Sequence, residues 1–215
     1  HDPRVHAFEL MDRRVDVMKA EGITFEEKAD NDNHNLPKGF DAYAVCTGTP
    51  QARDLNIPGR DLNGVHFALD LLSQQNRVLA GQTFSADERV TAKGKRVLVI
   101  GGGDTGSDCI GTSIRQGAVA VTQIEIMPKP PVGNNPATPW PQWPQVLRTS
   151  SSHEEGCERR WCLSSTRFIG KNNNVIGVEV EEVEWTPNPE GGRPLMKPTG
   201  KKEVIDTDLV LLAMG

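Results

Sequence analysis

Apolar positions change their spacing several times along the chain, and these changes divide it into helices and strands. Phe8, Met11, Val15 and Met18 recur at steps of three and four residues, which predicts a first helix. Gly22 stands where a helix C-cap belongs, so we expect this helix to end there. Short apolar runs at residues 23–26 and 42–47 predict strands.

The spacing of Phe67, Leu71 and Leu72 predicts a helix over residues 65–76. A polar stretch at residues 82–95 follows and is the best candidate for a domain boundary. We therefore expect two parts, a remnant of one domain with its connector at residues 1–90 and a second domain at 91–215.

The clearest unit lies in this second part. An apolar strand at residues 96–100, a helix at 104–116 ended by Gly117 and a strand at 119–127 follow one another. A proline-rich insertion at 128–144 interrupts the pattern. Ser151 and Ser152 each have a glutamate three residues later, a capping-box pattern that predicts a helix to about Leu163.

The last part of the chain alternates apolar and polar residues. Residues 175–185 alternate valine and glutamate as a half-exposed strand does, and residues 204–208 are expected to pair with them. Residues 209–214 are apolar enough for a buried parallel strand. The pattern predicts an α/β fold, a Rossmann-like parallel sheet with an antiparallel excursion.

Charge and hydropathy narrow the class of protein. Lys and Arg number 24 against 29 Asp and Glu, a net charge of −5, which gives no electrostatic reason to expect nucleic acid or an anionic membrane as partner. The longest apolar run, at 209–214, is far shorter than the ~20 residues that span a bilayer. We expect a soluble chain that is a piece of something longer, since it starts without Met and stops after a strand-like run.

The four cysteines, Cys46, Cys109, Cys157 and Cys162, do not form a C-x-x-C pair, and four residues separate the closest two. This spacing argues against a metal or iron–sulfur site within the chain. Cys46 lies in an apolar run and Cys109 in a predicted helix, where a buried thiol behaves as a small hydrophobe. We expect all four to be reduced and structural, as in a reducing compartment.

One motif carries chemistry, the run Gly101, Gly102, Gly103, Asp104, Thr105 and Gly106, which fits G-x-G-x-x-G between a strand and a helix. Gly101 permits the tight turn, Gly103 lets the backbone approach a pyrophosphate, and Gly106 allows the helix to pack closely on the strand. Glu125 stands 19 residues beyond Gly106, where a carboxylate binds an adenosine ribose. The motif predicts a dinucleotide site at the positive end of the helix.

Two weaker constellations have competing interpretations. Residues 150–154 contain serines beside His153, but a nucleophile and its base are matched in space rather than along the sequence, so a helix cap explains them better. Trp140 and Trp143 stand between prolines and suit a lid over a nicotinamide, an interface anchor or an ordinary packed loop.

Beyond these patterns, the chain resembles a known family. The runs at residues 97–109 (VLVIGGGDTGSDC), 121–128 (VTQIEIMP) and 148–156 (RTSSSHEEG) closely resemble the small subunit of glutamate synthase. They equally resemble the flavin-oxidoreductase domain fused to NADH-dependent glutamate synthases. Residues 46–50 (CTGTP), with Thr47 and Gly48, look like the crossing from the flavin domain, and Met214 and Gly215 like its counterpart leaving the nucleotide domain.

The resemblance implies a pair of nested domains, one for FAD and one for NAD(P)H. It implies hydride transfer from NAD(P)H to FAD, then electron transfer through iron–sulfur centres to FMN on a large subunit or domain that makes glutamate. The FAD fingerprint and cysteine-rich segment are expected upstream of His1, so this chain alone is not expected to hold FAD or to turn over. No catalytic residue is implied, because hydride transfer is the cofactors' own chemistry.

The resemblance leaves alternatives. One is the electron-entry module of a related pyrimidine-reducing flavoprotein, and another is a nucleotide-binding domain without turnover. Glu125 is followed by Ile126 and Met127, where the resemblance implies a pair of arginines in NADPH-using relatives. The chain is therefore expected to prefer NADH to NADPH. Lys129 is a competing feature, because it offers a positive charge to a 2′-phosphate in place of an arginine. The expected location is the cytoplasm or an organelle stroma.

Overall fold

A computed structural model describes residues 3–27, 37–46, 48, 51–142 and 144–215. The chain forms two compact units, His1–Thr47 and Gly48–Gly215. Each is described by itself.

The described residues of the first unit form one helix, α1 (Pro3–Ala20), as the apolar spacing predicts. The helix ends at Ala20, and Gly22 follows it with a φ of +93°, which is costly for other residues. The N–H of Ile23 donates to the carbonyl of Met18 at 3.0 Å in the manner of a glycine C-cap. The strand predicted at 23–26 is wrong, and so is the strand at 42–47 over its described residues 42–46. Apolar runs become strands only when a ladder partner is present, and neither run has one among the described residues.

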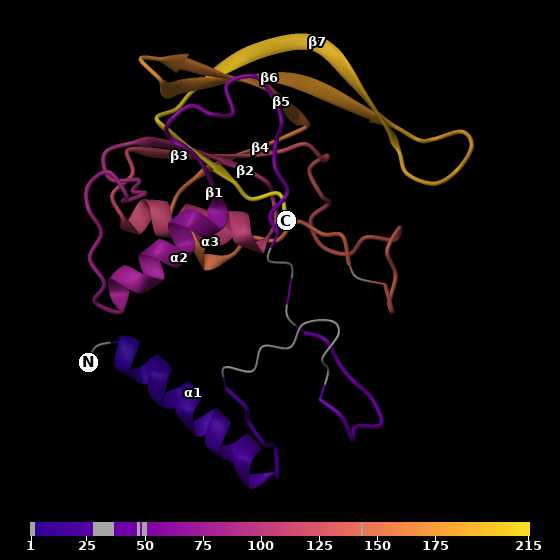
Figure 1. Cartoon of the computed structure of the whole chain (residues 1–215). Coiled ribbons are helices and arrows are strands. Elements are labelled where there is room, and N and C mark those ends of the chain that lie inside the picture. The colour runs from indigo at the N-terminus through magenta and orange to yellow at the C-terminus, as the bar shows by residue number, and fades with distance from the viewer. Residues whose placement is uncertain (1–2, 28–36, 47, 49–50, 143) are drawn as a thin grey trace. The chain divides into compact units, whose positions relative to one another are not determined.

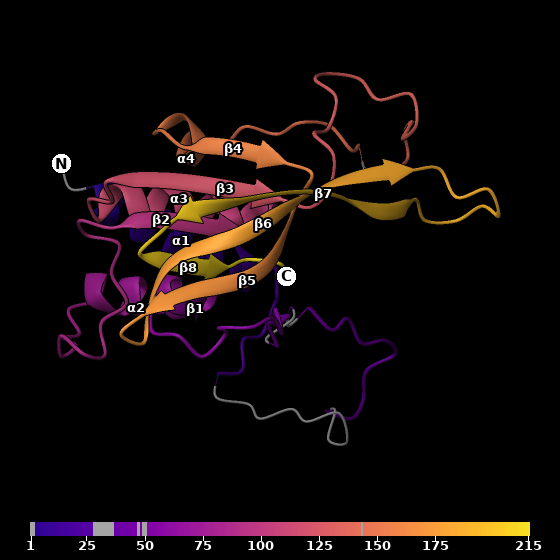
Figure 2. The ribbon, with the colours of Figure 1, turned by 90° about the horizontal axis from the view of Figure 1, so that it is seen from above.

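The second unit is built around a five-stranded parallel sheet of order β1-β8-β2-β3-β4. Its central strand β2 and both of its neighbours were predicted from sequence. The strands are β1 (Val65–Phe67), β2 (Arg96–Ile100), β3 (Ala120–Glu125), β4 (Glu158–Trp161) and β8 (Leu209–Leu212). Strands β3, β4 and β8 point the same way and end at one edge of the sheet (Figure 2).

Two helices cover one face of this sheet, α2 (Ala68–Leu79) and α3 (Asp104–Arg115). Leu71 of α2 and Ile110 of α3 are fully buried against Val99 and Leu211. The helix predicted at residues 65–76 therefore needs correcting, because its first three residues form β1. Val65, a β-branched residue, pairs in parallel with Val210, and this remote partner overrides the local helical spacing. Both β1 and α2 precede residue 91 yet share the sheet and core of β2.

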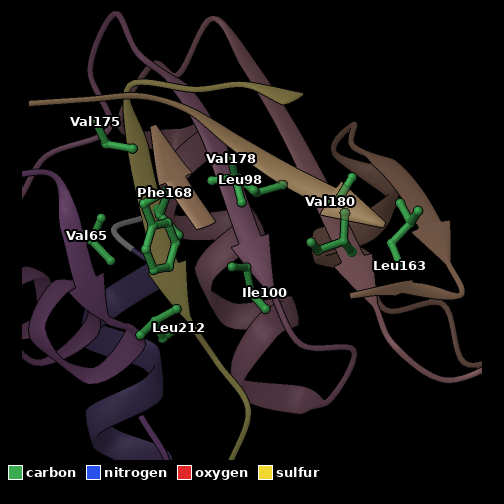
Figure 3. Close-up of a cluster of buried hydrophobic side chains, with 11 residues drawn as sticks. Val65, Leu98, Ile100, Leu163, Phe168, Val175, Val178, Val180 and Leu212 are labelled. Carbon is green, nitrogen blue, oxygen red and sulfur yellow. The ribbon is translucent and has the colours of Figure 1, made fainter. Parts of the chain in front are cut away.

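The predicted antiparallel excursion is present as a three-stranded sheet that covers the other face, so the unit has three layers (Figures 1 and 2). It consists of β5 (Leu163–Lys171), β6 (Asn174–Thr186) and β7 (Leu195–Asp206). Phe168 of β5 and Val178 of β6 point into a second apolar core with Leu98 and Ile100 of the parallel sheet (Figure 3). Because both faces of β2 are buried, its sequence reads as an uninterrupted apolar run.

Helix α4 is much shorter than predicted and spans only Ser151–Glu154. Its cap is Ser150, whose hydroxyl accepts from the N–H of His153 at 3.4 Å, while His153 Nδ1 accepts from the N–H of Ser150 at 3.1 Å. A capped helix is present as predicted, but the predicted capping pairs, Ser151 with Glu154 and Ser152 with Glu155, are wrong, because Ser150 and His153 form the cap. Gly156, with φ +120°, follows the helix, and the chain then joins the sheet as β4 instead of continuing to Leu163.

The four cysteines are free thiols. Cys109 is buried in α3, and burial raises its pKa to about 12, which fits a structural role. The expectation that Cys46 is buried is wrong, because Cys46 is exposed outside any strand. No described helix combines the length and the apolar character needed to cross a membrane.

A forked ion pair fastens the two central strands at their beginning. Arg96 donates from Nε to Asp208 Oδ2 at 3.0 Å and from Nη2 to Oδ1 at 2.9 Å. The Arg96 guanidinium lowers the pKa of Asp208 to about 2. Above the ordinary value of 3.8 the pair therefore contributes fully to folding, and the contribution disappears as the pH falls toward the folded pKa.

We expect Asp208→Asn to lower the free energy of unfolding by about 1 kcal/mol at neutral pH, a modest loss because solvent screens a half-exposed pair. The difference should shrink between about pH 4 and pH 2, measured by urea unfolding of both proteins. Asp206→Asn is the control, because Asp206 contacts Arg96 from a side chain that is 74% exposed. A difference that does not change with pH would contradict this account.

Candidate functional site

The glycine-rich turn lies where the order of the sheet reverses. From β2 the chain passes through α3 to β3 on one side, while β8 lies on the other side of β2. In open α/β sheets such a reversal leaves a crevice at the carboxyl ends of the strands. Residues Gly101–Gly103 occupy this crevice, directly before α3 begins at Asp104.

Two glycines of the turn are required by close backbone approach. Gly101 has a φ of +126°, and a Cβ on it would lie 2.1 Å from the carbonyl oxygen of Ala213. A Cβ on Gly106 would lie 2.5 Å from the carbonyl oxygen of Gly101. At both positions, where the motif predicts a tight turn for Gly101 and close helix packing for Gly106, there is room only for a hydrogen atom.

Gly103 is different, because no atom lies within 4 Å of the place where its Cβ would be. Gly102, Gly103 and Asp104 are exposed, and Gly103 is the N-cap of α3 without any side-chain cap. The first N–H groups of a helix have no partner within it and carry the positive end of its dipole. The turn therefore presents an open cradle for an anion, with bare backbone as its floor.

Glu125 ends β3 beside this cradle. Its Oε1 accepts from the N–H of Met127 at 3.1 Å, and its Oε2 would lie 2.4 Å from a Cβ on Gly102. The carboxylate thus lies over the turn, within reach of a group bound there. This is the place where the motif predicts a ribose-binding acid.

Three cavities surround the turn. The largest, about 620 Å³, includes Gly103 and Asp104 and the proline-rich insertion in its lining. A second, about 210 Å³, joins Gly102 and Glu125 to the ends of β3 and β4. A third, about 240 Å³, lies on the β8 side and is lined by Thr105 and Met214 among others. Together they form space on both sides of the cradle.

The remaining predicted site residues do not all lie at the cavities around the turn. Met214 and Gly215 line the third cavity, and the carbonyl of Gly215 accepts from the N–H of Arg53 at 2.9 Å. Gly48 is exposed and lines none of the three cavities. Thr47 lies outside the described residues.

Sequence reasoning missed a row of polar side chains that supports the turn. Gln123 is buried, and its Nε2 donates to the carbonyl of Gly101 at 2.9 Å. Its Oε1 accepts from Arg159 Nε at 3.2 Å and lies 3.3 Å from His153 Nε2. A signal was present, because Gln123 is a large polar residue in the middle of a strand in which Val121 and Ile124 are buried.

The row continues through the cap of α4 to the cavity. His153 Nδ1 lies 2.9 Å from Ser150 Oγ, which bonds the hydroxyl of Ser107 in the first turns of α3. Burial first, and the charge of Arg159 second, lower the pKa of His153. Since Nδ1 accepts from the Ser150 N–H, the ring is neutral with its proton on Nε2, aimed at Gln123.

A strand, a glycine turn and a helix N-terminus at a topological switch point define this unit as an α/β dinucleotide-binding domain. The sequence model described as "Pyridine nucleotide-disulphide oxidoreductase" matches residues 4–215. The chain belongs to the pyridine nucleotide-disulphide oxidoreductase family.

The relatives that the chain is similar to include glutamate synthase proteins. Over 212 residues it is 42% identical to the "Glutamate synthase [NADPH] small chain" of Mycobacterium tuberculosis, covering 95% of this chain and 42% of that one. Over 217 residues it is 35% identical to the "Glutamate synthase [NADH]" of Saccharomyces cerevisiae, covering 96% of this chain and 10% of that one. The chain thus spans less than half the length of either relative.

Among solved structures, the fold is similar to that of Mycobacterium tuberculosis FprA in complex with NADPH. The TM-score is 0.52 at 18% sequence identity, over 79% of this chain and 48% of the other. This similarity supports the fold, an α/β domain with an antiparallel three-stranded excursion.

The two kinds of glycine predict opposite results on substitution. Gly103→Val should leave the unfolding temperature nearly unchanged but abolish NADH binding, because the new side chain fills the open cradle. Gly101→Ala should destabilise the fold by about 1–3 kcal/mol or more, because strain at positive φ adds to the clash with Ala213. Calorimetric titration and thermal unfolding separate the two effects. Unchanged affinity in Gly103→Val would contradict the site.

Proposed function

We propose that this chain is the pyridine-nucleotide-binding part of a flavoprotein oxidoreductase that passes hydride from NAD(P)H to FAD and so supplies electrons for glutamate synthesis from glutamine and 2-oxoglutarate. The observation that carries the proposal is the bare glycine cradle at the switch point, with Glu125 over it and cavities on both sides. The relatives named above extend it from nucleotide binding to glutamate synthase.

The residues present fit a dinucleotide. The N–H groups at Gly103 and the start of α3 would hold the pyrophosphate, and Glu125 would accept hydrogen bonds from the adenosine ribose. The nicotinamide would extend toward the cavity that Thr105, Met214 and Gly215 line. When bound, the dinucleotide itself supplies the hydride.

The protein's part in this chemistry is position rather than proton transfer. Gln123 holds the carbonyl of Gly101, and the close approach of Ala213 fixes the same residue from the β8 side. The cradle is therefore set before the nucleotide arrives, which lowers the entropic cost of binding. We assign no catalytic residue in this chain.

The proposal extends to cofactors and partners outside the chain. FAD would be the hydride acceptor in the full-length protein, and iron–sulfur centres would carry electrons to FMN on a glutamate synthase large subunit or domain. Mixing the full-length protein with NADH under anaerobic conditions should bleach the flavin absorbance. If NADH binds and the flavin stays oxidised, the hydride-transfer proposal is wrong and the chain is a nucleotide-binding domain without turnover.

NADH is the preferred nucleotide in this proposal. A 2′-phosphate would lie close to the Glu125 carboxylate and be repelled, whereas a free 2′-hydroxyl would donate to it. Lys129, the competing cation, lies with its Nζ 5.0 Å from the centroid of the Trp161 ring. This contact draws the ammonium toward an aromatic face.

We expect the full-length protein to show a kcat/KM at least tenfold higher for NADH than for NADPH, a difference of about 1.4 kcal/mol. Glu125→Ala should lower kcat/KM for NADH and narrow the gap, because it removes both the acceptor and the repulsion. Glu184→Ala, an exposed carboxylate on β6, is the matched control. An equal or higher kcat/KM for NADPH in the unmodified protein would contradict both the preference for NADH and the role of Glu125 as the ribose ligand.

A further inference from the structure

His153 connects the cap of α4 to the side chain that supports the glycine-rich turn. The ring is half-buried and lines the cavity of about 620 Å³ together with Gly103 of the cradle. Its Nδ1 lies 3.1 Å from the backbone nitrogen of Ser150, and its Nε2 lies 3.3 Å from Gln123 Oε1. A helix cap uses only the first of these two nitrogens. The second nitrogen faces the nucleotide site and needs an explanation of its own.

The hydrogen-bonding roles of these groups leave one consistent arrangement. A backbone N–H can only donate, so Nδ1 accepts from Ser150 and the ring carries its proton on Nε2. The Nε2–H then donates to Gln123, whose Oε1 also accepts from Arg159 Nε at 3.2 Å. With its oxygen bound on that side, the amide presents its Nε2 to the carbonyl of Gly101, 2.9 Å away. The bonds therefore all donate in one direction, from the α4 cap to the turn.

The Gly101 carbonyl matters to the cradle because it sets the direction of the next N–H group. A trans peptide group points its C=O and its N–H in opposite directions. The Gly101 carbonyl faces α3, where it lies 2.5 Å from the place of a Cβ on Gly106 and accepts from Gln123. The N–H of Gly102 therefore points away from Gly106, on the exposed side of the turn where Gly102 lines the cavity. Gln123 thus orients one of the donors that the cradle offers to an anion.

Protonation of the ring would break this arrangement. An imidazolium carries an N–H on both nitrogens, so its Nδ1–H would face the N–H of Ser150, with two donor nitrogens 3.1 Å apart. The ring would have to turn toward the hydroxyl of Ser150, which lies 2.9 Å from Nδ1, and its Nε2–H would then turn away from Gln123. Burial lowers the pKa of His153, and the charge of Arg159 lowers it further. The neutral ring is therefore the stable form at neutral pH.

Charged groups surround this ring from several elements. Arg159 on β4 shares Gln123 with it, and Glu154 follows it on α4. Glu155, the next residue, is paired with Arg115 of α3. The charged residues that line the cavity together with His153 are Asp104, Lys129 and Arg148. Histidine is the side chain whose ordinary pKa lies between about pH 5 and 8, so a change of affinity in that range reports an imidazole.

We propose that His153 is a positioning residue for the nucleotide, and that its neutral form holds Gln123 and the Gly101 carbonyl in the arrangement that binds the pyrophosphate. The inference rests on the proposed function and adds a dependence on pH to it. Affinity should be greatest above the ordinary imidazole pKa of 6.5 and should fall as the pH drops through the lower pKa of His153, because binding then has to expel a proton. An imidazolium that instead contacted the phosphates directly would give the opposite sign, with affinity rising in acid.

The test is calorimetric titration of the full chain with ADP-ribose, the part of NADH that lacks nicotinamide and whose phosphates keep their charge in this pH range. The dissociation constant should rise roughly three- to fivefold from about pH 7.5 to about pH 5.5, the effect of losing one neutral hydrogen bond. Circular dichroism at each pH checks that the chain stays folded. His66→Gln is the matched control and should keep this pH dependence, because His66 lies on β1, which β8 and β2 separate from β3 in the sheet.

Two variants of His153 separate the cap of α4 from the positioning of the turn. In His153→Asn, the side-chain oxygen replaces Nδ1 as the acceptor for Ser150, but the side chain is too short to reach Gln123. It should unfold near the temperature of the unmodified chain, yet bind ADP-ribose about fivefold more weakly at every pH. In His153→Gln, the longer amide donates to Gln123 and does not titrate, so affinity should return at neutral pH and persist in acid. Unmodified affinity in His153→Asn, or no recovery in a folded His153→Gln, would contradict the positioning role.

A second measurement needs no disruptive variant. Long-range ¹H–¹⁵N spectra of the imidazole rings should show His153 with its proton on Nε2 at neutral pH, and its pKa should fall further when ADP-ribose is added. A proton on Nδ1, a pKa that rises on binding, or an affinity that does not change with pH would overturn the positioning role, while NADH binding by the unmodified chain kept the proposed function intact. Failure of the unmodified chain to bind NADH or ADP-ribose at any pH would instead reject the function.

Discussion

The close approach of three backbone segments at Gly101 is the constraint on which the site depends. This residue hydrogen-bonds β3 through Ile124 and lies so close to Ala213 that no side chain fits between them. The end of β2 is therefore held from both neighbouring strands at the point where the chain must turn into α3. Because the turn is fixed by packing, its next two residues are free to remain exposed and bare. An anion site made of backbone needs this combination of a rigid foundation and an empty surface.

Local sequence signals were sufficient for the part of the fold around this turn. The strand at 96–100, the helix from Asp104 and the strand that ends at Glu125 follow from an apolar run, a glycine turn and a periodic segment that are adjacent in sequence. Elements that depend on distant partners were predicted poorly. Residues 65–67 form a strand only because β8, far along the chain, pairs with them, and residues 158–161 form one because β3 offers its edge. The apolar runs at 23–26 and 42–46 show the converse, since without a partner they form no strand.

The residues of the candidate site also fall into two groups, those that local sequence predicts and those whose roles depend on distant partners. The glycines and Glu125 were predictable because the motif fixes their order and spacing along a single strand–turn–helix unit. Gln123, Ser107 and His153 were not, because their hydrogen bonds cross from β3 and α3 to a cap 30 or more residues away. Sequence alone predicts only a helix cap at residues 150–154. The Nε2 of His153, aimed at Gln123, shows that a capping residue can also support a binding turn, a double use that no spacing rule contains.

The long edge strand β7 raises a separate matter, the solubility of the antiparallel sheet. Nearly all of β7 is exposed, and no strand among the described residues pairs with the outer side of its twelve residues. Such an edge invites a strand from another molecule. Pro198 has no N–H group, so it cannot donate a hydrogen bond to a neighbouring strand. Lys197, Lys201 and Lys202 would each lose hydration if a strand of another molecule paired with β7. Within the part of the chain that the structure describes, the outermost strand therefore carries its own protection against pairing with the edge of another sheet.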